Sequence, residues 1–305
     1  MNITDPIYSD ENKAREHFER LQWPDGPICP HCGVIDQATK LEGESTRPGV
    51  YKCNECRKPF SVTVGTVFER SHIPLNKWLY AMHSLCSGKK GVSAHQLHRQ
   101  LGITYQSSWF MCHRIREAMR IAKFEAPLGG KFKTVEVDET YIGGKATNRK
   151  SRKVKPKKIV VSLVQRDGDV RSFPITKVNS RKINALLRKQ VSKKAHLMTD
   201  DSPMYPRIGK QFNRHSSVNH SIEEYVRGDV YTNTVENYFS ILKRGVIGTY
   251  HHISNQHVPM YLAEFDFRYN ARKISDTERT EKAIKGAVGK RLTYRRIGEA
   301  TLAKA

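Results

Sequence analysis

Three acidic residues stand at positions from which their side chains could hold divalent metal ions. Asp138 and Asp200 each follow a short run of strand-forming residues, and we expect each to lie where its strand ends. Carboxylates at the ends of adjacent strands can converge, and hard oxygen ligands suit Mg²⁺ or Mn²⁺. Glu236 offers a third carboxylate from a helix. Two such ions would activate water or a 3′-hydroxyl for in-line displacement at phosphorus.

The segment around Glu236 is "VYTNTVENYFSILKRG", residues 230–245, which has the spacing of an amphipathic helix. Lys243 shares the polar face of that helix with Glu236 and could neutralise a phosphate oxygen. The structural alternative is that Asn233 caps the helix and Glu236 closes a capping box. Three neighbouring acids also compete for the role of ligand: Glu136, Glu139 and Asp201.

Four cysteines form two C-x2-C pairs, Cys29 with Cys32 and Cys53 with Cys56. Two turns of this kind supply the four thiolates of a tetrahedral Zn²⁺ site, which predicts a structural zinc ribbon. The ribbon could read DNA or serve only to stabilise a small module. His31 lies inside the first turn and is not needed as a ligand. The other two cysteines occupy apolar positions of helical segments and are expected in the core: Cys86 and Cys112.

The charge of the chain indicates what it binds. Its 305 residues include 53 Lys and Arg against 30 Asp and Glu, a formal net charge of +23. A surplus on this scale favours a polyanion, and we expect double-stranded DNA. No apolar leader is present and no apolar run is long enough to span a membrane. We therefore expect no membrane partner, a cytoplasmic location and association with the nucleoid.

Residues 145–158, "KATNRKSRKVKPKK", contain basic residues and no acid. They could clamp DNA phosphates near the acids, or form an ordinary solvated loop. The candidate DNA contacts are Lys145, Arg149, Lys150, Arg152, Lys153, Lys155, Lys157 and Lys158. His220 precedes the helix of Glu236 and could orient the scissile phosphate, although a structural histidine fits equally well.

Residues 91–119 have the helix start and stop signals of a helix-turn-helix motif. Two helical patterns are separated by a break at Leu101-Gly102-Ile103, and Ser93 and Thr104 are the expected N-caps. Polar residues at the start of the second helix favour DNA contact, and a plain helical hairpin is the alternative.

The elements that must position the acids predict an α/β domain with a mixed sheet. In order, they are a strand in 133–144, a hairpin around Asp167-Gly168, a helix in 180–191, a strand in 195–201, and helices in 231–246 and 257–272. The whole chain divides into a polar segment with a short helix (1–27), the zinc ribbon (28–60), a helical DNA-binding module (61–128), the catalytic domain (130–272) and a basic tail (273–305).

Four motifs in this order, "VEVDETYIGG", "MTDDSPMY", "NTVENYFSILKRGVIGTYHH" and "YLAEFDFRYNAR", resemble the DDE-type transposases of bacterial and archaeal insertion sequences. The similarity is to insertion sequence family 1595, which joins a zinc ribbon to an RNase H-like catalytic domain, and it covers roughly residues 28–272. It implies Asp138 and Asp200 as metal ligands, with Glu236 and Lys243 as the helix pair. Some relatives carry asparagine at the helix position, which keeps Asn233 in reserve.

The resemblance implies a transposase that binds terminal inverted repeats, cuts DNA strands with Mg²⁺ or Mn²⁺ and joins them to target DNA. Both ends of an element must be cut together, so we expect a homo-oligomer on DNA. Two rival functions stay open: a catalytically silent zinc-ribbon DNA-binding protein, and a Mg²⁺-dependent nuclease without strand transfer.

Overall fold

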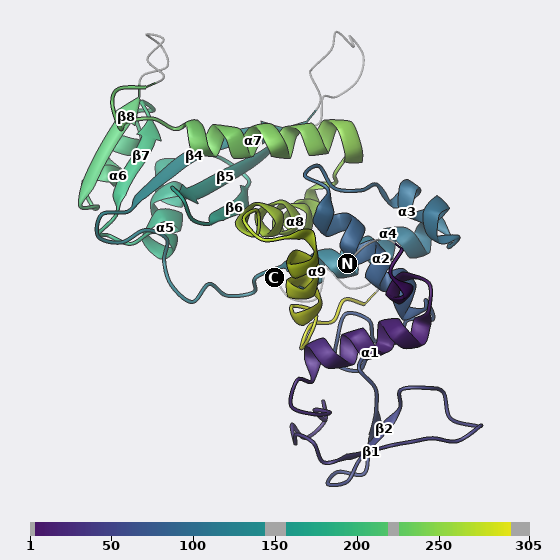
Figure 1. Ribbon diagram of the computed structural model, residues 1–305. Helices are drawn as coiled ribbons and strands as arrows, with labels where there is room; N and C mark the ends of the chain where they lie inside the picture. The colour runs from purple at the N-terminus through teal and green to yellow at the C-terminus, as the bar shows by residue number, and fades with distance from the viewer. Residues whose placement is uncertain (1–3, 144–156, 219–225, 294–305) are drawn as a thin grey trace, which may run out of the picture. The chain divides into compact units, whose positions relative to one another are not determined.

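The computed structural model describes residues 4–143, 157–218 and 226–293 (Figure 1). The chain divides into two compact units, one formed by Met1–Arg120 with Ile274–Ala305 and the other by Ile121–Lys273. Among the helices within the described ranges, none is long and apolar enough to cross a membrane.

The first unit contains a small sheet and a group of helices. The sheet is antiparallel and consists of β1 (Ala38–Lys40), β2 (Tyr51–Cys53) and β3 (Pro59–Phe60). The helices are η1 (Pro6–Tyr8), α1 (Glu11–Gln22), α2 (Leu75–Ser87), α3 (Ala94–Leu101), α4 (Tyr105–Met119) and α9 (Asp276–Lys285). Helix α2 is central, because it packs against α1, α4 and α9 and buries Trp78 and Leu79. Helix α9 falls in the segment that the sequence marked only as a basic tail.

The helix pair α3–α4 forms where the sequence predicts it. The Ser93 and Thr104 side chains accept hydrogen bonds from the backbone N–H groups of Gln96 and Ser107, each at 3.1 Å, so both expected N-caps are confirmed. Gly102 ends α3 with φ +59°, a left-handed conformation that glycine adopts at little cost. The core positions expected for Cys86 and Cys112 are also confirmed, at 0% and 1% exposure.

The second unit is built on a five-stranded mixed sheet in the order β6-β5-β4-β7-β8. Its strands are β4 (Thr134–Ile142), β5 (Lys158–Gln165), β6 (Val170–Ile175), β7 (His196–Asp200) and β8 (Arg214–Val218). Strands β4, β5 and β6 are antiparallel neighbours, whereas β7 runs parallel to both β4 and β8. This order, with the first strand in the centre, is an RNase H-like arrangement and confirms the predicted α/β class.

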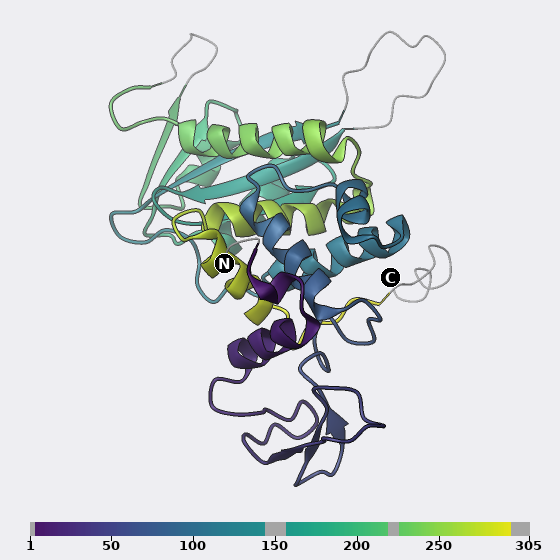
Figure 2. The same cartoon turned by 45° about the vertical axis from the view of Figure 1, so that its right-hand side comes forward.

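Helices cover both faces of this sheet. On one face α7 (Asn233–Gly245) and α8 (Val258–Asn270) share a core with Val160 and Val164. On the other face α5 (Ser180–Gln190) and α6 (Tyr205–Gly209) pack on Val135 and Val137. Between α7 and α8 the chain forms a short π-helix, η3 (Val246–Tyr250), and a short 3₁₀ helix, η4 (Asn255–His257). Figure 2 shows α7 running along the sheet. Because strand side chains alternate, the even-numbered residues of β4 point toward α7.

Two sequence expectations about this unit need correction. Asp138 does not end a strand: β4 continues to Ile142, because its second half stays paired with β5. Strand β8 was not predicted, because its sequence "RHSSV" has little apolar character; it joins the sheet by pairing with β7.

Candidate functional site

Asp138 and Asp200 come together at the point where β4 and β7 separate. The two strands pair in parallel up to Glu136 beside Met198, so that two residues further along Asp138 lies level with Asp200. Asp138, Glu139 and Asp200 each offer one carboxylate oxygen, and these oxygens all lie within 4.8 Å of one another. Asp138 accepts a hydrogen bond from the Glu139 N–H at 2.6 Å, and Asp200 accepts one from the Ser202 N–H at 3.2 Å.

Glu139, which was predicted only as a competing ligand, is the third member of this cluster. Its carboxylate accepts a hydrogen bond from the Tyr205 hydroxyl at 2.8 Å. The pKa of Glu139 is raised to about 7, mainly by burial and also by the charges of Asp138 and Asp200, while the hydrogen bond from Tyr205 opposes the shift. Three carboxyl groups this close repel one another when ionised. A divalent cation would offset that repulsion, so the donor set fits Mg²⁺ or Mn²⁺.

Glu236 lies in the first turn of α7 with its side chain exposed. Its carboxylate accepts a hydrogen bond from the Thr232 hydroxyl at 3.1 Å, and it is not one of the three carboxylates gathered within 4.8 Å. Lys243 is exposed near the other end of the same helix. The capping-box alternative is wrong, because Thr232 occupies the N-cap and Asn233 is already the first helical residue.

A different carboxylate holds the start of α7. Glu136 is fully buried on β4 and accepts hydrogen bonds from the backbone N–H groups of Thr234, at 2.9 Å, and Val235, at 3.0 Å. It also forms an ion pair with Arg166, at 2.7 Å between Nε and Oε1. Alternation along β4 placed Glu136 on the same face as Asp138, but only the folded chain shows that it meets a helix N-terminus.

The four cysteines predicted as zinc ligands are gathered in the first unit. Their sulfur atoms all lie within 4.8 Å of one another, with Cys29 and Cys56 3.7 Å apart and Cys32 and Cys53 3.6 Å apart. A tetrahedral site with Zn–S bonds of about 2.3 Å requires sulfur atoms about 3.8 Å apart, so the thiol set fits zinc. The ring of His31 instead contacts the Pro59 carbonyl at 3.3 Å.

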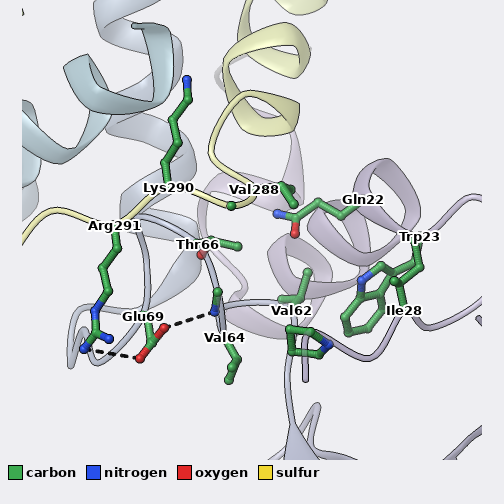
Figure 3. Close-up of a pocket in the computed structure, with 13 residues that line it drawn as sticks. Gln22, Trp23, Ile28, Val62, Val64, Thr66, Glu69, Val288, Lys290 and Arg291 are labelled. Atoms are coloured by element: carbon green, nitrogen blue, oxygen red, sulfur yellow. Dashed lines mark hydrogen bonds and ion pairs between the residues drawn. The ribbon is translucent and has the colours of Figure 1, made fainter. Parts of the chain in front are cut away.

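The same unit has a cavity of about 470 Å³ beside the ribbon (Figure 3). Glu69 on its wall accepts a hydrogen bond from the Gly65 N–H at 3.1 Å and pairs with Arg291 at 3.4 Å. Most of the remaining wall is apolar, including Trp23 and Val62. The lining lacks the grouped carboxylates or thiols that would hold a metal ion.

The basic stretch and His220 fall largely outside the described residues. Lys157 is exposed and Lys158 begins β5. The other six basic candidates, Lys145, Arg149, Lys150, Arg152, Lys153 and Lys155, lie outside the described ranges, as does His220. Their proposed contacts with DNA therefore rest on sequence and charge alone.

Comparison with known proteins agrees with the two motif groups. Residues 127–270 match the ISXO2-like transposase domain, and residues 9–59 match the transposase zinc-ribbon domain. A protein of the transposable element ISH50 from Halobacterium salinarum is 25% identical over 279 residues, covering 86% of this chain and 91% of that protein. A pre-cleavage Mos1 transpososome structure is 13% identical over 66% of this chain and 75% of that one, but its TM-score of 0.18 supports no structural argument. On the matches to both domains, the chain belongs to the insertion-sequence transposases of family 1595.

Proposed function

We propose that this transposase cuts DNA strands at the ends of its insertion sequence and joins the freed 3′-hydroxyl groups to target DNA. The observation that carries the proposal is the convergence of Asp138 and Asp200 on the central strands of the family's catalytic domain. We assign Asp138, Asp200 and Glu236 as the ligands of two divalent ions. The ions would activate the oxygen nucleophile and offset charge on the phosphate.

The other residues that we assign to the site contact the DNA or support the metal ligands. Lys243 is exposed on the same helix as Glu236 and contacts a phosphate oxygen near the scissile bond. Glu139 lies beside the two aspartates and is held by a hydrogen bond from Tyr205. Asn233, at the start of α7, is the alternative ligand if Glu236 does not reach the ions, and His220 is the alternative phosphate contact.

The binding of element ends requires surfaces outside this site. We assign this role to the zinc ribbon, to the α3–α4 pair and to the basic stretch at 145–158. Tyr105, 44% exposed at the start of α4, stacks on His95 with ring centroids 4.1 Å apart, and both side chains are suited to contact DNA. Two ends must be cut together, so the active form on DNA is a homo-oligomer.

The test uses Asp138→Asn, Asp200→Asn and Glu236→Gln, with Asp201→Asn as the matched control because Asp201 is an exposed acid beside Asp200. The substrate is a labelled duplex carrying the element's terminal repeat, incubated with Mg²⁺ or Mn²⁺ and a target plasmid. We expect the first three variants to lose cleavage and joining while retaining zinc and end binding, and the control to remain active.

Normal activity in all three site variants would overturn the metal-site assignment. If only Glu236→Gln were active, Asn233 would become the third candidate ligand. Cleavage by the unaltered protein without joined product would identify a nuclease instead of a transposase.

A further inference from the structure

We propose that the buried Glu136–Arg166 pair is a positioning device that fixes the first turn of α7, and through it Glu236, relative to Asp138. The inference rests on the proposed function, because it concerns how that site is assembled. Neither residue is assigned contact with DNA or metal. Their role is exerted through the backbone of α7 and of the segment that leads into it.

The Glu136 carboxylate accepts three hydrogen bonds from residues of α7. Besides the N–H groups of Thr234 and Val235, it accepts a hydrogen bond from the Thr234 hydroxyl at 2.9 Å. These N–H groups belong to the first turn of α7, where backbone N–H groups have no acceptor within the helix. The positive end of the helix dipole also favours a carboxylate at this position. The residue at the N-cap itself, Thr232, makes no side-chain capping bond. A side chain from the sheet thus takes the place of a local cap.

Arg166 connects the same carboxylate to the segment before α7. Its guanidinium donates to the carbonyl oxygens of Asp229 and Tyr231, each at 2.8 Å, while its Nε donates to Glu136. It also lies over the Tyr231 ring, 3.5 Å from the centroid. A guanidinium presents several donors in one rigid plane, so it can hold two carbonyls and a carboxylate at once, which a lysine cannot do.

The sequence positions of these residues make the pair relevant to the metal site. Glu136 and Asp138 lie two residues apart on one face of β4, about 7 Å along the strand. On the helix side, Glu236 directly follows Val235, whose N–H is bound to Glu136. The distance between the Asp138 and Glu236 backbones is therefore set by a short path through one buried carboxylate. Weakening the hydrogen bonds of Glu136 would let Glu236 move relative to Asp138 and Asp200.

A matched pair in the same unit separates positioning from general stability. Glu264 and Arg268 form another ion pair, within α8, with side chains 0% and 5% exposed. Glu264 also accepts a hydrogen bond from the Tyr250 hydroxyl. Glu264→Gln and Glu136→Gln thus remove the same charge from the same kind of buried pair, but only Glu136 binds the first turn of α7.

The experiment compares Glu136→Gln and Glu264→Gln in the full-length, zinc-loaded protein. The first measurement is the Mn²⁺ concentration for half-maximal cleavage of a terminal-repeat duplex. We expect an increase of about tenfold for Glu136→Gln and less than about twofold for Glu264→Gln. The second is hydrogen exchange without metal or DNA, in which the amides of Thr234 and Val235 should lose protection only in Glu136→Gln. Arg166→Lys is the milder variant, to be used if Glu136→Gln does not fold.

Two results would overturn the proposal: an unchanged Mn²⁺ requirement in Glu136→Gln, or an equal change in both glutamine variants. If the unaltered protein does not cleave DNA at all, the proposed function fails. The positioning role of the Glu136–Arg166 pair can still be tested by hydrogen exchange at Thr234 and Val235 and by the Mn²⁺ affinity measured with electron paramagnetic resonance. Unchanged protection and unchanged Mn²⁺ affinity in Glu136→Gln would then reject it.

Discussion

The carboxyl group of Asp266 should make the second unit less stable as the pH rises through about 6. Asp266 lies on α8 and accepts hydrogen bonds from the Ser172 N–H at 2.8 Å, the Ser172 hydroxyl at 2.7 Å and the Tyr238 hydroxyl at 2.5 Å. Tyr238 belongs to α7, so this network joins the helix of Glu236 to β6 and α8. Burial raises the pKa of Asp266 from 3.8 to about 6, against the opposing effect of the hydrogen bonds from Tyr238 and Ser172.

The size of the effect follows from the difference between the folded and unfolded pKa values. A carboxyl group whose pKa is higher in the fold binds its proton more tightly there, so its stabilising effect is present below 3.8 and is lost as the pH rises through about 6. Complete ionisation costs about 3 kcal/mol of unfolding free energy. Between pH 5 and pH 8 the loss from this group alone is about 1.4 kcal/mol, since part of the proton is already lost from the unfolded chain at pH 5.

The assay must report on the second unit. All three tryptophans, Trp23, Trp78 and Trp109, lie in Met1–Arg120, so their fluorescence would follow the other unit. Hydrogen exchange in β6 and α8, corrected for the intrinsic rate at each pH, gives the opening free energy of the correct region.

Subtracting the Asp266→Asn values from those of the unaltered protein cancels the other titrating groups. The difference should become less favourable to the unaltered protein by about 1.4 kcal/mol from pH 5 to pH 8. A difference that does not vary with pH would show that the three hydrogen bonds outweigh burial, and the reasoning would be refuted.

Three further outcomes are expected. Elemental analysis should find about one zinc per chain, lost in Cys53→Ser and kept in Cys86→Ser, since only the former belongs to the thiol cluster; zinc retained in Cys53→Ser would reject the ribbon site. The logarithm of DNA affinity should fall by several units per unit of log salt concentration, because bound Lys and Arg release counterions; a flat plot would reject electrostatic binding. Alanine at the eight basic positions of 145–158 should weaken binding to all DNA sequences alike, whereas unchanged binding would assign the stretch to an ordinary solvated loop.

Local signals explain which parts of the fold could be predicted. The caps Ser93 and Thr104 each act on a backbone N–H three residues away, so the sequence alone contains the whole interaction. The hairpin between β5 and β6 is equally local, since its turn needs the left-handed conformation that Asp167 adopts at φ +57°. The apolar stripe of α7 is likewise confirmed, with Val235 and Tyr238 both buried.

Non-local interactions explain what was missed. Strand β8 has the mostly polar sequence "RHSSV" and exists because β7 offers it an unpaired edge. Asp138 was expected at a strand end because it follows a short run of strand-forming residues, but β5 pairs with β4 from Val135 to Ile142 and keeps the chain extended past it. In both cases the decisive partner is another strand, which no local pattern identifies.

The capping of α7 shows the same limit at the site itself. Asn233 followed three residues later by Glu236 suggests a local capping box, and this interpretation gave Glu236 a structural role that competed with metal binding. In the fold, Glu136 binds the helix N–H groups instead, although 98 positions in the sequence separate it from Thr234. Because a buried carboxylate from the sheet already binds two N–H groups of the first turn, Glu236 is not needed for that purpose. The assignment of Glu236 as a metal ligand therefore has one structural competitor fewer, and the Glu136–Arg166 pair becomes the first place to look for mutations that disturb the site without touching it.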